Sequence, residues 1–461
     1  MSDSNLPLWD VLRNWWNILQ EVDTRTSTIV VSASNSVDPT LAPAAYRCSG
    51  AADDVEINAA LTAASAVGGE VLLLEGTFVP AATITYPANI LGLRGLGRAT
   101  FIQPVMFGDA ITVSGRDDIV IRDLAIDTKT GATFGHCIFI EDGSDRFRIE
   151  NVWIIDSDSD GIHVEGTTID TGYIEGCHIL AADGTGIEVD MDAANFMYRL
   201  HVDGNDIRNC GATGITFGSS GGNHYCEITN NIIDSCTSDG ILVLDGDYSM
   251  IRGNICTSNG GEGIDLLSTE HAQVLGNTYQ GNTLDGIYIT TSNNITVVGN
   301  TCQGNTLSGI SLLSSNGCHL TGNTCDENVR HGIYMESSND GTVVGNACNG
   351  NDSGDTGTYD GISIIVAVGN LILGNQCRDN DGWGIMVGNA SDYNKISMNY
   401  TNGNTSGSIR VNNANCDNNT IGFNTVEEGA PSDAPGTNTR SYGNYDPSAN
   451  AFVGNVGAAP W

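Results

Sequence analysis

The feature that most constrains the fold is a pattern repeated between Ile251 and Thr425. In each copy an aliphatic residue precedes Gly-Asn, a second Asn follows five positions later, and Gly-Ile comes next. The Asn of the first pair recurs at a constant interval, at Asn254, Asn277, Asn300, Asn323 and Asn346, with equivalents at Asn375 and Asn399. A period of about 23 residues is typical of a solenoid.

The Gly-Ile pair extends the repeat upstream as far as Gly161-Ile162. After each pair the apolar residues alternate, as in Ile264 and Leu266, which is the period of a strand, and the unit is too short for two helices. The sequence therefore predicts an all-β fold, a parallel β-helix with about 23 residues per turn. Equivalent positions would stack about 4.8 Å apart. The two Asn columns are then structural ladders at the corners and not catalytic groups.

The cysteines follow the same repeat. Five of the 13 occupy one slot, two residues after the Asn of Gly-Asn: Cys256, Cys302, Cys325, Cys348 and Cys377. Tyr279 and Thr401 fill that slot in other turns, so it is a packing position in which a thiol acts as a small apolar group. We expect free thiols rather than disulfides, and zinc is disfavoured because the chain has no Cys-x-x-Cys pair.

The formal charge of −37, with only two lysines, excludes nucleic acid as a natural partner. It also argues against a strongly acidic polysaccharide unless divalent cations bridge the two. No apolar stretch is long enough to cross a bilayer, so membrane insertion is not expected.

Four regions are expected along the chain. Residues 1–23 form an amphipathic, Trp-rich helix that docks on the bottom of the solenoid, on another copy or on a larger particle, and residues 24–50 form a linker with one short strand at 28–32. Residues 51–425 form the β-helix, and residues 426–461 form an extended tail with Phe452 and Trp461 as anchors. The N-terminus lacks the basic and apolar regions of a secretory signal.

The start of the repeat region carries a second pattern. Asp53-Asp54 opens an Ala-rich helix over residues 53–66, followed by Gly68-Gly69, an apolar strand over 71–74 and Gly76-Thr77-Phe78. This resembles the N-terminal cap of the pectate-lyase-like superfamily of right-handed β-helix proteins. The superfamily includes polysaccharide lyases, glycoside hydrolases, alginate epimerases and phage tail-spike depolymerases. The resemblance implies a right-handed, single-stranded parallel β-helix with an N-terminal capping helix, and an activity on polysaccharides.

Outward positions of the Gly-Ile strand are where we expect chemistry, because the inward positions hold the aliphatic stack. With Ile138, Ile162 and Ile187 as equivalent inward residues, three successive turns expose acids and an imidazole. The predicted catalytic residues are Glu141, His163, Glu165, Glu188 and Asp190, and the predicted substrate contacts are Phe139, Asp156, Asp158, Tyr288 and Tyr334.

Glu141, Glu165 and Asp190 would form one column with about 4.8 Å between neighbours. Carboxylates this close cannot all be charged, so at least one should have a raised pKa and donate a proton while another stays ionised. Glycosidases use such a pair, about 5 Å apart for retention and about 6.5 to 9.5 Å for inversion. His163 adds a further acid or base. The same carboxylates could instead bind calcium or be a solvated face without a role; no other cofactor is expected.

Several other polar residues have a simpler explanation. Asp160, Asp239, Asp285 and Asp360 all precede Gly-Ile, so capping of a turn accounts for them. His331 shares their slot and is also interpreted as structural.

Two hypotheses follow. The first is a tail-spike-like depolymerase, a homotrimer at the virion surface or otherwise outside the cell, that hydrolyses a surface polysaccharide with carboxylates. Lyase chemistry is less favoured, because the resemblance implies an outward Arg or Lys base and none stands near the acids. Epimerase chemistry is less favoured, because the family's Asp-Pro-His-Glu pattern is only faintly echoed by Gly161-Ile162-His163-Val164-Glu165. The second is a non-catalytic adhesin or surface fibre, with Tyr288 and Tyr334 as a sugar-stacking platform.

Overall fold

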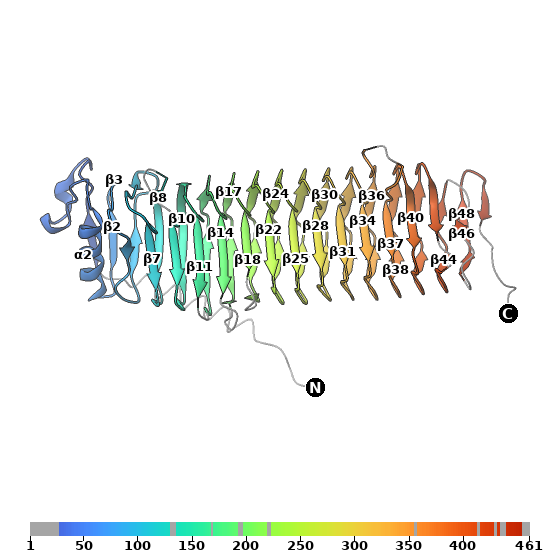
Figure 1. Ribbon diagram of the computed structural model, residues 1–461, viewed down its shortest axis with the longest axis horizontal. Helices are drawn as coiled ribbons and strands as arrows, with labels where there is room; N and C mark the ends of the chain where they lie inside the picture. Colours follow the sequence, from blue (N-terminus) through green and yellow to red (C-terminus); the bar gives the residue numbers. More distant parts are fainter. Residues whose placement is uncertain are drawn as a thin grey trace, which may run out of the picture.

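The computed structural model describes residues 27–129, 135–166, 169–191, 197–218, 223–354, 357–412, 415–427, 431–433 and 439–453. It is a straight rod of stacked coils (Figure 1), so the predicted parallel β-helix is confirmed. The Trp-rich helix predicted for residues 1–23 and the anchor Trp461 lie outside the described residues. None of the described helices is both long and apolar enough to span a membrane.

Each coil contributes one strand to each of three parallel walls. Wall one is a 15-stranded sheet made of β4 (Ile84–Thr85), β7 (Ile111–Ser114), β9 (Ile138–Glu141), β11 (Ile162–Gly166), β14 (Ile187–Met191), β18 (Ile215–Gly218), β22 (Ile241–Leu244), β25 (Ile264–Leu267), β28 (Ile287–Thr290), β31 (Ile310–Leu313), β34 (Ile333–Glu336), β37 (Ile362–Ile365), β40 (Trp383–Gly388), β43 (Gly407–Val411) and β46 (Ser432–Asp433). This wall carries the Gly-Ile positions.

Wall two follows wall one in each coil. Its strands are β1 (Thr28–Val31), β2 (Glu70–Leu73), β5 (Gly92–Arg94), β8 (Val120–Asp127), β10 (Phe147–Asp156), β12 (Gly172–Glu175), β16 (Leu200–Asp203), β20 (Glu227–Thr229), β23 (Met250–Arg252), β26 (Gln273–Leu275), β29 (Thr296–Val298), β32 (His319–Thr321), β35 (Thr342–Val344), β38 (Leu371–Leu373), β41 (Lys395–Ser397), β44 (Thr420–Gly422) and β47 (Arg440–Tyr442). The long strands β8 and β10 continue through wall three.

Wall three completes each coil. It contains β3 (Gly76–Phe78), β6 (Thr100–Ile102), β13 (His178–Ile179), β17 (Asp206–Arg208), β21 (Ile232–Asp234), β24 (Ile255–Thr257), β27 (Thr278–Gln280), β30 (Thr301–Gln303), β33 (Thr324–Asp326), β36 (Ala347–Asn349), β39 (Gln376–Arg378), β42 (Tyr400–Asn402), β45 (Thr425–Val426) and β48 (Asn444–Asp446), with β49 (Ala451–Val453) antiparallel to β48. The short strands β15 (Met197–Tyr198) and β19 (Asn223–His224) pair apart from the walls.

The interior is filled as the pattern predicts. Ile264 and Leu266 are fully buried, and the same slots of neighbouring coils hold buried aliphatic residues. The corners carry the predicted ladders: Nδ2 of Asn254 donates to Oδ1 of Asn277 over 3.1 Å, and Asn277 repeats the bond to Asn300 over 3.0 Å. All 13 cysteines are free and buried, which confirms their packing role.

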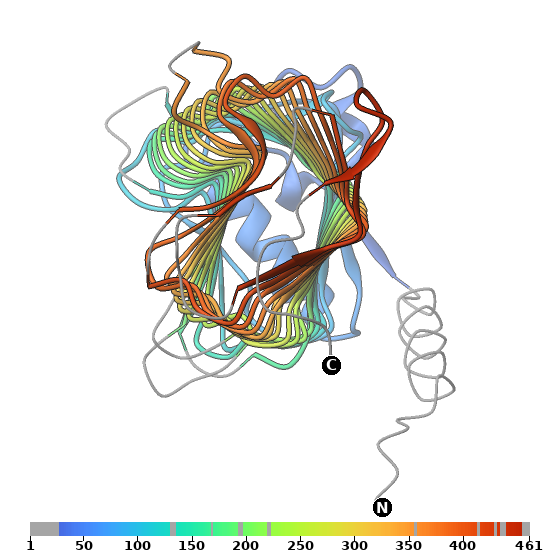
Figure 2. The same ribbon diagram turned by 90° about the vertical axis from the view of Figure 1, so that its right-hand side faces the viewer.

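The helix α2 (Asp54–Ser65) closes the N-terminal end of the rod, where it crosses the lumen in the view along the axis (Figure 2). It buries Ile57 and Leu61 against the first coils. The carboxylate of Asp53 accepts hydrogen bonds from the amides of Gly50 and Val79 over 2.9 and 2.8 Å. The acidic opening of the predicted cap therefore fastens the helix to the first coils.

The segments on either side of the predicted solenoid also contain strands. In the predicted linker, β1 pairs with β2, and the short 3-10 helices η1 (Pro39–Leu41) and η2 (Ala44–Tyr46) follow it. In the predicted tail, β47 and β48 add a further coil, because Asn444 accepts a hydrogen bond from Nδ2 of Asn424 over 2.9 Å and so extends the ladder. The anchor Phe452 remains 75% exposed.

Candidate active site

The first site residues stand on three neighbouring strands of wall one, β9, β11 and β14. Ile162 pairs with Ile138 on one side and with Ile187 on the other, and all three side chains are buried. Because side chains alternate along a strand, the residues after each isoleucine face outward. The register expected from the Gly-Ile pairs is therefore the observed one, with His163 between Phe139 and Glu188, and Glu165 beside Asp190.

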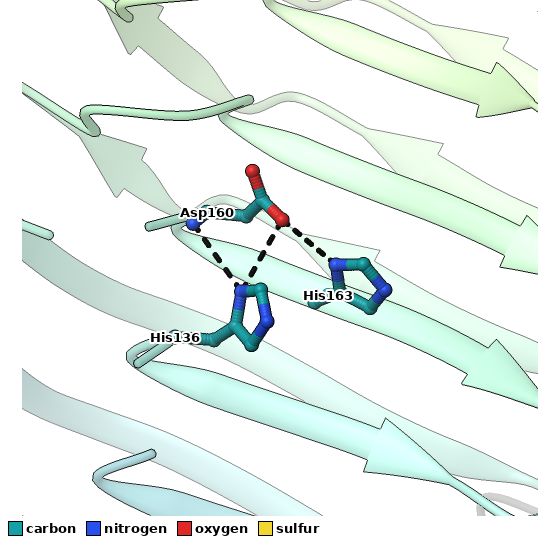
Figure 3. Close-up of side chains that lie close together, drawn as sticks. All are labelled: His136, Asp160 and His163. Atoms are coloured by element: carbon teal, nitrogen blue, oxygen red, sulfur yellow. Dashed lines mark hydrogen bonds and ion pairs between the residues drawn. The ribbon is translucent and has the colours of Figure 1, made fainter. Parts of the chain in front are cut away.

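His163 is held by a residue from the corner that precedes its own strand. Nδ1 of His163 donates to Oδ2 of Asp160 over 2.7 Å (Figure 3). The same oxygen lies 3.2 Å from Nδ1 of His136, one coil earlier, and the two imidazole rings are 4.4 Å apart. The other carboxylate oxygen of Asp160 accepts the amide of Thr185 over 2.6 Å. Asp160 thus ties together three successive coils.

The capping role expected for Asp160 is real but incomplete. Asp239, Asp285 and Asp360 each accept the amide of the equivalent residue one coil later, as Asp160 does. Asp160 in addition binds His163 through its second oxygen. Capping therefore accounts for one carboxylate oxygen of Asp160, and the contact with His163 for the other.

These contacts set the protonation states of the pair. Burial alone would raise the pKa of Asp160, but the nearby His136 imidazole and the hydrogen bonds from His163 and from the Thr185 amide hold it below its usual value. Burial opposes charge on His163, yet the bond to Asp160 and the nearby carboxylates outweigh it and raise the pKa of this imidazole. Asp160 is consequently an ionised group that orients and charges His163.

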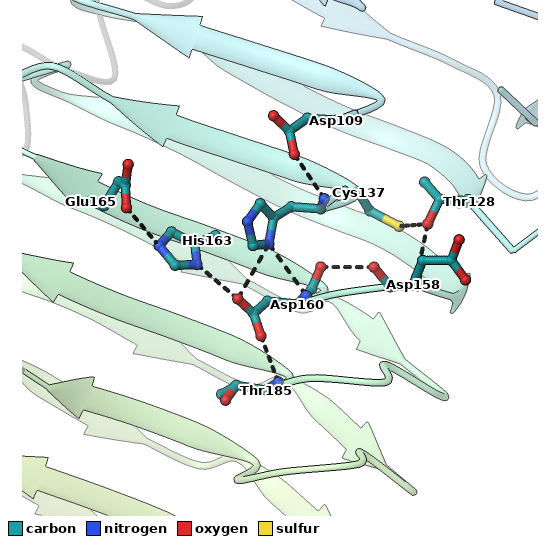
Figure 4. Close-up of polar contacts among 10 residues, drawn as sticks. Asp109, Thr128, Cys137, Asp158, Asp160, His163, Glu165 and Thr185 are labelled. Atoms are coloured by element: carbon teal, nitrogen blue, oxygen red, sulfur yellow. Dashed lines mark hydrogen bonds and ion pairs between the residues drawn. The ribbon is translucent and has the colours of Figure 1, made fainter. Parts of the chain in front are cut away.

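The second ring nitrogen of His163 faces the carboxylates. Nε2 is buried, has no hydrogen-bond partner among the described residues, and lies 3.3 Å from Oε2 of Glu165 (Figure 4). The Glu165 side chain is 46% exposed and the His163 side chain 12%. A proton carrier thus stands just beneath the outer surface, next to an accessible carboxylate.

The flanking carboxyls have raised pKa values. Burial is the main cause of the raised pKa of Glu188, and the charge of Asp160 adds to it. Burial also raises the pKa of Glu141, with further contributions from Asp142 and Glu165. A group that holds its proton and a group that stays ionised are the two requirements of acid–base catalysis at one site.

Sequence reasoning missed His136, which stacks on Phe139 at 5.4 Å between ring centroids. The residue stands two positions before Ile138, in the slot that Asp160 occupies before Ile162. Its turn lacks the Gly-Ile signature, so only alignment of the coils on their buried isoleucines would have identified it.

Other predicted residues lie away from this cluster. Asp156 and Asp158 stand at the corner, where Lys129 lies 3.4 Å from Asp156 and the amide of Asp158 donates to Thr128 over 3.2 Å. Tyr288 and Tyr334 are on wall one, but five and seven coils beyond His163, so about 24 and 34 Å away. The structure does not bring these two tyrosines together with the acids.

A metal could be considered at the imidazole pair. His136, Asp160 and His163 place ligand-type atoms within 4.8 Å of one another. Imidazole nitrogens with a carboxylate suit zinc-like ions, whereas calcium takes about six to eight oxygen ligands. The expectation of calcium therefore concerns the carboxylates of Glu141, Glu165 and Asp190.

Comparison with known proteins supports the architecture. The family model for the right handed beta helix region matches residues 167–325, 217–359 and 285–456, more than half of the chain together, and the protein belongs to this family. No curated protein sequence matches the chain.

Several solved structures are similar in fold. The catalytic unit of a GH87 alpha-1,3-glucanase from Streptomyces thermodiastaticus has 14% identity and a TM-score of 0.50, covering 87% of this chain and 68% of that chain. The A-module of the mannuronan C-5 epimerase AlgE6 from Azotobacter vinelandii has 16% identity and a TM-score of 0.48, covering 84% and 95%. Tailspike protein 3 of bacteriophage CBA120 has 15% identity and a TM-score of 0.45, covering 64% and 55%. At these identities the likeness is one of fold.

Proposed function

We propose that the protein hydrolyses a polysaccharide at the outer face of wall one, around His163. The observation that carries the proposal is the buried Nε2 of His163, which lacks a hydrogen-bond partner among the described residues and lies 3.3 Å from Glu165. A glycanase is also among the proteins that share the fold.

The residues divide into two roles. Nδ1–H of His163 donates a hydrogen bond to Asp160, and because the pKa of this imidazole is raised, the charged ring turns Nε2–H toward Glu165 and the surface. Glu165 then takes one proton from a water molecule as the water oxygen bonds to the anomeric carbon, and the charged His163 stays beside the Glu165 carboxylate. Glu188 or Glu141, with its raised pKa, gives its proton to the glycosidic oxygen as that bond breaks. Asp190 and Phe139 flank the sugar.

The expected setting is a surface polysaccharide outside the cell or at a virion surface, with the protein acting as a homotrimer. A rod with a single-sided site suits an extended polymer. Light scattering after size-exclusion chromatography measures the number of subunits.

The decisive experiment is a panel of bacterial exopolysaccharides incubated with the wild type and with Glu165→Gln. New reducing ends report hydrolysis, and absorbance of unsaturated uronates reports elimination. We expect reducing ends without unsaturation, and a loss of about 10² to 10⁴-fold in the variant. The matched control is Glu270→Gln, an exposed carboxylate at the corner after wall one. Binding without any product from the whole panel would replace this proposal with the adhesin.

A further inference from the structure

The coil between Gly332 and Gly361 departs from the regular repeat. Its ladder partners Asn346 and Asn375 have a sequence separation of 29, against 23 for Asn323 and Asn346 in the coil before it. The extra residues are organised by the buried carboxylate of Asp352, which accepts the amides of Thr358 and Tyr359 over 2.8 and 3.2 Å. The insertion thereby fixes Tyr359 at the edge of wall one.

Two arginine side chains in this region stack on aromatic rings. The guanidinium carbon of Arg330 lies 5.6 Å from the ring centroid of Tyr359, one coil later. The guanidinium carbon of Arg410 lies 5.3 Å from the ring centroid of Trp383, one coil earlier. The coils of the two rings are adjacent, since the Trp383 amide donates to Asp360 over 2.8 Å. Arg330 and Arg410 therefore come from coils that are three apart, but the rings on which they stack belong to adjacent coils.

Neither cation is neutralised by an ion pair. Within the described parts of the chain, Arg330 and Arg410 have no carboxylate oxygen within 4 Å, although the protein has 55 acidic and 18 basic residues. Some arginines nearer the N-terminal end do form ion pairs, as with Arg148, whose Nη1 lies 2.6 Å from Glu150 and 2.9 Å from Glu175. Other arginines of the described structure also lack an ion pair, and what marks Arg330 and Arg410 is that each stacks on a ring at the start of wall one, on adjacent coils.

The buried carboxyl of Asp360 offsets the charge of Arg410 only in part. Burial raises the pKa of Asp360 to about 7, against hydrogen bonds from Trp383 and Ser363 that lower it. A guanidinium stacked on a ring keeps its N–H edge available for a planar or tetrahedral anion. The ring also limits its rotamers, so less entropy is lost when the anion binds.

We propose that Arg330 and Arg410, supported by Tyr359 and Trp383, form a binding site for the anionic groups of a polysaccharide. This inference rests on the proposed function in one respect, that the polymer is the one cleaved near His163. Asp360 lies eight coils from Asp160 on wall one, so the two sites are about 38 Å apart. A long acidic polymer can contact both, and a short fragment only one.

Binding is tested without turnover in the Glu165→Gln background. Polygalacturonate, dextran sulfate and neutral dextran are titrated into this protein and into the same protein with Arg330→Gln and Arg410→Gln. The control carries Arg252→Gln and Arg440→Gln, two exposed wall-two arginines without a carboxylate within 4 Å in the described structure. Thermal melting confirms that all variants fold.

We expect a polyanion to bind, neutral dextran not to bind, and the affinity to fall at least about tenfold in the Arg330/Arg410 variant only. Preference for polygalacturonate identifies carboxylates as the ligand, and preference for dextran sulfate identifies sulfate esters. Equal loss in the control, retained binding, or no polyanion binding in the parent protein would overturn the inference. None of these outcomes depends on cleavage, so they test the binding site independently of the proposed hydrolysis.

Discussion

The regular middle of the solenoid, residues 251–346, differs from the two sections that flank it. Ladder partners in the middle have a constant sequence separation of 23. Before it, the separation is 25 from Asp160 to Thr185 and 28 from Cys177 to Asn205, and after it 29 from Asn346 to Asn375. Within the described residues no large apolar side chain between Ile255 and Val366 is exposed. The His163 cluster and Tyr359, the ring on which Arg330 stacks, both lie where the spacing departs from the regular value, whereas Arg330 itself belongs to the last regular coil.

The difference in spacing distinguishes residues that the hydrogen-bond ladders need from residues that the ladders merely allow. In the middle, each coil repeats the hydrogen bonds of the one before, so the ladder positions that carry the Asn-to-Asn bonds are held by Asn in every coil. Where an interval lengthens, extra corner residues such as Tyr359 are free to carry side chains that the ladder does not need. We therefore expect strictly repeated coils to serve as scaffold, and functional residues to lie where the sequence spacing of the coils changes.

Within the middle section, we expect the largest loss of stability when a ladder residue is replaced. Nδ2 of Asn300 donates to the carbonyl of Val274 and to Oδ1 of Asn323, both over 2.9 Å, and its own Oδ1 accepts the amide of Asn277. Asn300→Ala leaves these buried groups unpaired, so we expect a loss of about 3 kcal/mol or more in the free energy of unfolding. Urea denaturation measures it.

Two controls make that result a test of the comparison. Asn294→Gly changes an exposed residue whose φ is +58°, a conformation that glycine adopts freely, and should alter stability by only a few tenths, about 0.5 kcal/mol at most. Below its melting temperature, Asn300→Ala should retain cleavage at the distant His163 site. A loss of cleavage in the fully folded variant would show that scaffold and site are not separable in this way.

The sequence predicted the parts of this fold that repetition dictates. The Asn ladders, the inward isoleucines and hence the outward column of Glu141, Glu165 and Asp190 all follow from one strand period and one corner chemistry. The role of Asp160 could not be predicted, because its second oxygen reaches His163 by a choice of rotamer that capping does not require. His136 lacked the Gly-Ile marker, and Tyr359 lies in an insertion whose conformation depends on the buried Asp352. Contacts between different coils at irregular corners therefore cannot be predicted from a single sequence.

A smaller, pH-dependent change in stability is expected from Asp265, on wall one of the middle section. Burial, together with the charges of Asp239 and Asp285, raises the pKa of Asp265 to about 7. Because the folded value exceeds the unfolded one, the folded state holds this proton more tightly, and the resulting stability is present below about pH 4 and lost as the pH rises through about 7.

Asp265→Asn removes this ionisation while it keeps the shape of the side chain. We expect the variant to be more stable than the wild type at pH 8, by on the order of 1 to 2 kcal/mol, and nearly equal at pH 4.5. Unfolding curves at the two pH values measure the difference. Identical pH profiles for the two proteins would mean that Asp265 is ionised in the fold without penalty.

The smallest expected effect concerns a hydroxyl inside the lumen. Tyr279 occupies the slot that Cys256 and Cys302 fill in the adjacent coils, is fully buried, and its hydroxyl has no hydrogen-bond partner in the described structure. Since a buried polar group without a partner costs free energy, Tyr279→Phe should raise the free energy of unfolding by about 1 kcal/mol. Tyr288→Phe, on the outer face of the neighbouring coil, should leave it unchanged. A loss of stability in Tyr279→Phe would instead indicate a water molecule bound in the lumen, and the middle section would then contain a polar site of its own.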